Sequence, residues 1–145
     1  MEFAGTVTVK QPRTKVWTFL LTPELVTRCV PNLGRWEATA AQMFTAEFIF
    51  RWGEKSVLFN SELSWLDLET ASRAQMHVIG HSAHSSFHAT THMALTEIFS
   101  DMTQIQWAVQ AGMAGKLAEF PAPFLKTAAL IGINKFFNNV KQALE

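Results

Sequence analysis

The stretch FLKTAALIGINKFFNNVKQAL, at residues 124–144, decides the fold. Its apolar residues recur every three or four positions, which is the spacing of residues on one helix face. The first half of the stretch is apolar nearly all round, so more than one of its sides needs cover. The sequence therefore predicts one long helix from Phe124 to Leu144 that packs against a large apolar surface or meets a ligand, a partner or a lipid surface.

The rest of the chain supplies an apolar surface as a series of strands, because apolar and polar residues alternate between short polar breaks. The expected strands are 2–9, 35–40, 43–52, 55–66, 73–82, 86–97 and 102–111. The breaks from residue 35 onward are too short for crossover helices, so these strands should be antiparallel neighbours. One face of the resulting sheet is aromatic and uncharged, and the opposite face carries the polar residues.

Two short helices are expected between the first strand and the others. Pro12 stands where a helix can begin, and Thr22 and Pro23 fit the N-cap and first position of a second helix. That helix stops before Pro31, and residues 32–34 are typical of a turn. The pattern predicts an α+β fold in a single domain, residues 1–145, with a seven-stranded antiparallel sheet around a long C-terminal helix.

Composition excludes several classes of protein. The 145 residues are 48% hydrophobic and carry no net charge, which argues against a nucleic-acid binder. Cys29 is the only cysteine, so an internal disulfide and a cysteine-based zinc site are excluded, and a reducing, cytoplasmic location is expected. No apolar run approaches the roughly 20 residues of a membrane span. Twelve Phe, five Trp and no Tyr indicate either an apolar core or an apolar cavity.

Several short motifs occur in a familiar order along nearly the whole chain. They are Phe3-Ala4-Gly5, Val16-Trp17-Thr18-Phe19-Leu20, Pro23-Glu24-Leu25-Val26, Cys29-Val30-Pro31, Gly115-Lys116-Leu117-Ala118 and Phe136-Phe137-Asn138-Asn139-Val140. In these motifs the chain resembles the CoxG family of carbon monoxide dehydrogenase subunits, in the START/birch-pollen-allergen (SRPBCC) superfamily of helix-grip folds. It departs from that pattern at Asn32, where relatives usually have glycine, and at GHSAHSS, residues 80–86, where they have a glycine-rich turn.

The resemblance implies a function as well as a fold. Founding members of the family accompany molybdenum-containing carbon monoxide dehydrogenase and are thought to help associate it with the membrane. The wider superfamily binds lipids, sterols, quinones and polyketides between the sheet and the terminal helix. We therefore expect non-catalytic binding of a lipid, quinone or similar molecule, without a cofactor, as an accessory of such a dehydrogenase at the inner face of the membrane. The alternatives are an interaction adaptor without a ligand and, less favoured, a small cyclase or hydrolase.

The expected ligand site lies between the aromatic face of the sheet and the terminal helix. Its expected lining is Phe48, Phe50, Phe59, Leu63, Met76, Val78, Met93, Trp107 and Phe124. The inward strand positions hold no acid, base or histidine, and only Ser61, Thr91 and Thr103 are polar there. This argues against catalysis, which needs an inward acid, base or nucleophile. Residues 121–124 and 32–34 could open as a gate or serve as rigid connectors.

Histidines form the last candidate site. His77 and His81 alternate on one expected strand, and His88 and His92 on the next. A turn centred on residues 84–85 would set His81 opposite His88 and His77 opposite His92, on the outward face. Opposed Cβ atoms lie about 4.5–5.5 Å apart, so each pair could share a divalent metal. The simpler interpretation is that these are ordinary surface histidines.

Overall fold

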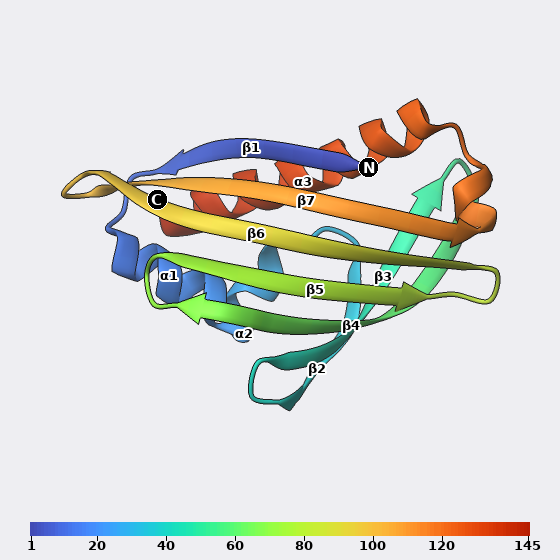
Figure 1. Ribbon diagram of the computed structural model, residues 1–145, viewed down its shortest axis with the longest axis horizontal. Coiled ribbons are helices and arrows are strands. Elements are labelled where there is room, and N and C mark those ends of the chain that lie inside the picture. The colour runs from blue at the N-terminus through green and yellow to red at the C-terminus, as the bar shows by residue number, and fades with distance from the viewer.

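The computed structural model describes residues 1–145, apart from the side chain of Trp52. One antiparallel sheet of seven strands, in the order β1-β7-β6-β5-β4-β3-β2, is crossed on one face by a long helix (Figure 1). The elements are β1 (Glu2–Val9), α1 (Arg13–Leu21), α2 (Pro23–Val26), the 3-10 helix η1 (Thr27–Cys29), β2 (Leu33–Ala40), β3 (Met43–Trp52), β4 (Lys55–Glu69), β5 (Arg73–His81), β6 (Ser85–Phe99), β7 (Met102–Gly115), the 3-10 helix η2 (Lys116–Glu119) and α3 (Ala122–Leu144). The predicted α+β architecture is confirmed.

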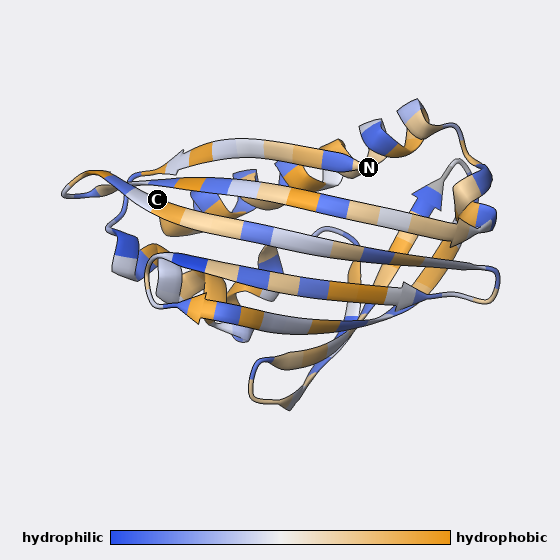
Figure 2. Cartoon of the chain, in the orientation of Figure 1, coloured by the Kyte–Doolittle hydropathy of each residue, from blue (hydrophilic) through white to orange (hydrophobic). Residues whose placement is uncertain are grey.

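The main core lies where α1 and the C-terminal end of α3 meet the sheet. Val9, Val16, Ile105 and Val140, from β1, α1, β7 and α3, are fully buried there. Hydropathy alternates along the strands, as Figure 2 shows, because successive side chains point to opposite faces of the sheet. Burial of the apolar face against these helices is the main source of stability, at roughly 25 cal/mol per Å² of apolar surface.

The strands extend past their expected ends. β4 continues to Glu69, β6 to Phe99 and β7 to Gly115. Near its end β7 still pairs residue by residue with β6, with Gly115 opposite Ser85. Small and polar residues at these ends interrupt the hydropathy pattern, but they do not interrupt the backbone hydrogen bonds, which hold the ladder together.

The short helices form where the prolines predict them, but two details of the prediction are wrong. Pro23 opens α2, as expected, but the Thr22 hydroxyl does not cap that helix and instead donates to the Thr18 carbonyl oxygen at 2.5 Å. The expected turn at residues 32–34 is also wrong for two of its residues. Leu33 and Gly34 belong to β2, and Asn32 alone has a positive φ, of 59°.

Candidate functional site

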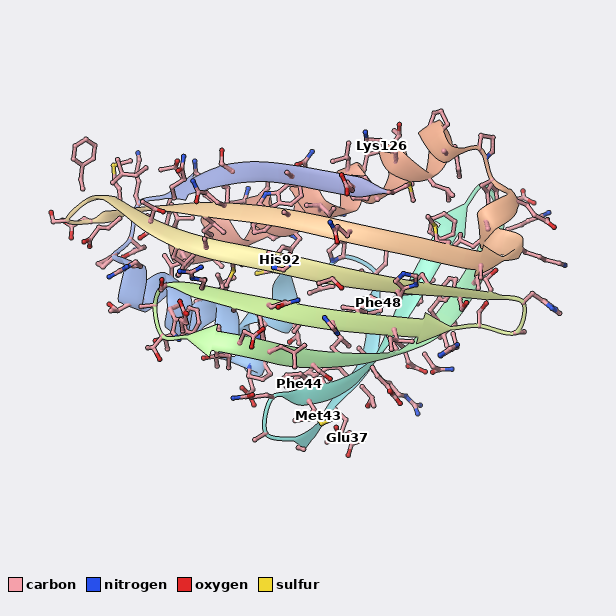
Figure 3. The ribbon with its side chains drawn as sticks, in the orientation of Figure 1. Glu37, Met43, Phe44, Phe48, His92 and Lys126 are labelled. Atoms are coloured by element: carbon pink, nitrogen blue, oxygen red, sulfur yellow. The ribbon has the colours of Figure 1, made fainter. Side chains whose placement is uncertain are left out.

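A chamber of about 210 Å³ lies between the sheet, the α2–η1 segment and the C-terminal half of α3. Its lining is Leu20, Leu21, Pro23, Val26, Thr27, Val30, Leu33, Trp36, Phe44, Ala46, Phe48, Leu63, Trp65, Ala74, Met76, Thr91, Met93, Trp107, Phe136 and Phe137. On β3 to β6 the lining residues come from alternate positions, so the sheet turns a continuous apolar surface toward the helices. Phe44 and Phe48, for example, both come from β3 (Figure 3).

Aromatic rings form the side of the chamber between α3 and β7. The Trp107 ring stacks on Phe137, with centroids 5.6 Å apart and planes at 19°. Phe136 meets Phe137 edge-on, with centroids 5.0 Å apart. Trp107 can take this position because Gly5, opposite it on β1, has no Cβ; a Cβ there would lie 2.6 Å from Cζ2 of the indole. A glycine on β1 thus sets the shape of the chamber wall.

The α2–η1 segment forms another wall of the chamber, and hydrogen bonds fix its shape. The Thr27 hydroxyl donates to the Pro23 carbonyl oxygen at 2.6 Å, which occupies one of the few polar groups of the lining. Asn139 Nδ2 donates to the Cys29 carbonyl oxygen at 3.0 Å and so ties α3 to η1. Burial raises the pKa of the Cys29 thiol, which keeps it neutral at ordinary pH.

The chamber offers a ligand almost no polar contact. Among the side chains that the structure describes, its lining contains no charged residue and no histidine, and its two polar residues are Thr27 and Thr91. Thr103, which was expected beside them, is fully buried and donates to the Gln11 carbonyl oxygen at 2.8 Å, as a core hydroxyl usually does. The chamber can therefore exclude water and hold apolar surface, but it holds no general acid or base.

The structure brings together five of the nine residues expected to line a cavity. Phe48, Leu63, Met76, Met93 and Trp107 line the chamber. The α2–η1 wall was missed, because such short segments carry no hydropathy period that tells which side chains point inward. Trp36 was missed although its strand was expected, and a register shift between Leu33 and Trp36 interrupts the alternation there.

The other four expected residues lie elsewhere. Phe50 and Phe59 line a separate groove, and Val78 is half-buried outside the chamber lining. Phe124 is 42% exposed and stacks on Phe120, with centroids 5.4 Å apart. Phe124 lies away from the chamber because the chamber contacts only the C-terminal half of α3, whereas Phe124 is in the first turn of that helix.

Among the side chains that the structure describes, the Ser61 hydroxyl is the one buried polar group without a hydrogen-bond partner. Its Oγ is buried and makes no hydrogen bond, and the residue is 3% exposed. Ser61 pairs with Ala46 on β3 and with Gly80 on β5, next to the ring of Phe87. It therefore sits at the border of the chamber, since Ala46 belongs to the lining and Ser61 does not.

The predicted histidine pairs do not form. Observed partners on β5 and β6 set His81 opposite Ser86 and His88 opposite Ile79, while His77 faces Thr90. The turn is centred one residue earlier than expected, because the Ser82 amide donates to the Ser85 carbonyl oxygen at 2.9 Å, and this shifts the register by two residues.

A two-residue shift keeps every side chain on its face. All four histidines are therefore still outward and exposed, and His92 opposes Gln75. Among the residues that the structure describes, there is no group of three or more His, Cys, Asp or Glu side chains that could hold a metal ion.

Comparison with known proteins identifies relatives that match nearly the whole chain. The profile of the CoxG family, described as a subunit of carbon monoxide dehydrogenase, matches residues 5–145. No curated protein matches the chain. A conserved protein from Geobacillus kaustophilus has a similar structure, with a TM-score of 0.93 and 19% identity over 99% of this chain and 95% of that one.

Two further solved structures share the fold. A START superfamily protein from Mycobacterium smegmatis matches with a TM-score of 0.76 and 12% identity, over 99% of this chain and 96% of that one. A protein from Rhizobium loti matches with a TM-score of 0.73 and 13% identity, over 99% and 96%. At these identities the likeness shows the fold alone. In the part of the chain that the structure describes, no helix is long and apolar enough to cross a membrane.

Proposed function

Because the chain belongs to the CoxG family of carbon monoxide dehydrogenase subunits, we propose that its chamber binds an uncharged hydrophobic molecule without acting on it chemically. The observation that carries this proposal is the lining itself, in which threonines are the only polar residues among the described side chains. A charged ligand would lose its hydration there and gain no partner. An apolar ligand gains roughly 25 cal/mol for each Å² of its surface that leaves water.

The size of the chamber limits what it can take. Its volume of about 210 Å³ is below the roughly 300–1,000 Å³ of typical ligand pockets. A ring system or a short chain fits this space. A whole lipid or quinone needs either the α2–η1 wall to move outward or part of the molecule to stay outside the chamber. The proposed ligand is therefore a lipid, a quinone or a similar molecule that inserts its apolar part.

The lining favours binding over catalysis. A cyclase or hydrolase needs a positioned acid, base or nucleophile, and the described lining offers two threonines, one of which already donates to the backbone. We propose a carbon monoxide dehydrogenase-type oxidoreductase as the partner, on the strength of the family alone. An adaptor that docks without any ligand is the competing function, and the two differ in what the purified protein carries.

The first experiment is organic extraction of the purified protein followed by mass spectrometry. Binding is then measured with N-phenyl-1-naphthylamine, an uncharged apolar probe that fluoresces away from water. Val26→Trp fills the chamber from α2, and Leu25→Trp is the matched control, because Leu25 is 38% exposed and does not line the chamber.

We expect a co-purified hydrophobic molecule, probe binding by the unmodified protein, and at least tenfold weaker binding by Val26→Trp alone. An empty extract together with no probe binding would favour the adaptor. Equal probe binding by the two tryptophan variants would place the probe outside the chamber and contradict the proposal.

A further inference from the structure

A second hollow lies between the β3–β4 hairpin, the β5–β6 turn and η2. Figure 1 shows these elements at the end of the sheet away from α1 and α2. We call this hollow the end groove. Its volume is about 780 Å³, and its lining is Phe50, Lys55, Ser56, Val57, Leu58, Phe59, Ser82, Ala83, His84, Ser85, Lys116, Leu117, Glu119, Phe120 and Pro121. None of these residues lines the chamber, so the end groove is a separate site.

The end groove has an apolar floor. Phe59 and Leu117 are buried and form a small core with half-buried Phe50, Val57 and Phe120. The rings of Phe50 and Phe120 meet edge-on, with centroids 6.5 Å apart. This floor offers aromatic and aliphatic surface to the chain or ring of a ligand.

The rim of the end groove is polar and basic. Lys55 comes from the start of β4 and Lys116 from the start of η2, with His84 from the turn between them in sequence. Glu119 is the one carboxylate in the described lining. Two ammonium groups against one carboxylate leave one excess positive charge among these three side chains. The rim thus complements a ligand with a single negative charge.

Backbone contacts hold the basic rim in place. The Lys116 amide donates to the His84 carbonyl oxygen at 2.9 Å, and the Leu117 amide donates to Ser85 Oγ, also at 2.9 Å. Gly115 makes this approach possible, because its φ is +76° and a Cβ there would collide with the His84 carbonyl oxygen. The histidine- and serine-rich turn that departs from the family pattern is therefore what positions Lys116.

We propose that the end groove binds a free, monoanionic amphiphile such as a medium-chain carboxylate. The apolar chain lies on the aromatic floor, and the head group lies between Lys55 and Lys116, where charge-assisted hydrogen bonds are available. The volume falls within the range of ordinary ligand pockets. This site is independent of the chamber, whose lining carries no cation among the described residues.

The test compares laurate with dodecan-1-ol by calorimetry, below their aggregation concentrations, because the two differ in head-group charge and share the same chain length. We expect laurate to bind roughly tenfold more tightly at low salt, and this advantage to fall as salt rises. The double variant Lys55→Gln with Lys116→Gln should bind laurate no better than dodecan-1-ol. We expect this variant to fold, since Lys116 makes its contact to the turn through the backbone.

Three controls make the result decisive. Lys126→Gln removes an exposed lysine of α3 outside the end groove, and it should leave laurate binding unchanged (Figure 3). Val26→Trp should also leave laurate binding unchanged. Loss of laurate binding in this variant would show that laurate binds in the chamber, and it would overturn the proposal. Equal binding of laurate by the double variant and the unmodified protein would overturn it too. The proposal would also be overturned if the protein sediments with anionic vesicles but does not bind monomeric laurate. The end groove would then recognise the head group of a membrane lipid.

Discussion

At the scale of single residues, the missing side chain of Gly5 shapes the chamber wall. Gly5→Ala places a Cβ 2.6 Å from the Trp107 ring, which must then leave its stack on Phe137. Overpacking of this kind costs about 1–3 kcal/mol. We expect urea denaturation to show that loss and the fluorescent probe to bind more weakly.

Gly132→Ala is the control for this prediction. A Cβ at Gly132 meets nothing within 4 Å, and alanine favours the helix by roughly 1 kcal/mol over glycine. This variant should be more stable than the unmodified protein. Equal stability of Gly5→Ala and the unmodified protein would show that the Trp107 ring does not depend on Gly5.

Cys29 gives a second prediction at this scale. Its side chain is buried, and desolvation raises the pKa of its thiol. The raised pKa lowers the concentration of thiolate, which is the nucleophile, and burial keeps the reagent away from it. Iodoacetamide at pH 8 should therefore alkylate the folded protein far more slowly than the urea-unfolded protein, as followed by intact mass. Equal rates would mean that η1 opens readily.

At the scale of elements, strand identity and facing could be predicted from the sequence, but the register of β5 on β6 could not. Alternation places Met76 and Met93 on the inner face whatever the pairing, because a shift of two residues preserves facing. Register depends on the turn. Hydrogen bonds between Ser82 and Ser85 fix the centre of the β5–β6 turn. The hydropathy pattern does not predict these hydrogen bonds.

The Ser85 hydroxyl also joins two elements, which makes a third prediction. Ser85→Ala removes the acceptor of the Leu117 amide, and Leu117 itself is buried. An amide left without a partner away from water costs about 1–3 kcal/mol. We expect that loss in urea denaturation, together with faster hydrogen exchange of the Leu117 amide.

Ser86→Ala is the matched control, because Ser86 lies on the outward face and pairs with His81. It should leave both the stability and the exchange rate unchanged. Unchanged exchange in Ser85→Ala as well would show that η2 does not rely on the turn.

At the scale of the whole molecule, the sheet and its terminal helix could be predicted from the sequence, whereas neither hollow could be outlined in full. The strand side of the chamber followed from alternation, as for Leu63 and Trp107. The end groove depends on Lys55 and Lys116, which are 61 positions apart in the sequence and line one groove only in the folded chain. The hydropathy pattern of the sequence does not indicate tertiary proximity of this kind.

Two separate sites predict additive stabilisation. A ligand at 100 times its Kd adds about 2.7 kcal/mol to the free energy of unfolding when it binds only the folded protein. Because the chamber and the end groove share no described lining residue, N-phenyl-1-naphthylamine and laurate should each add this amount, and together roughly twice as much. Val26→Trp should remove the contribution of the uncharged probe alone, and the double lysine variant that of laurate alone. A combined effect no larger than the greater single effect, measured by urea denaturation, would mean that both molecules compete for one site.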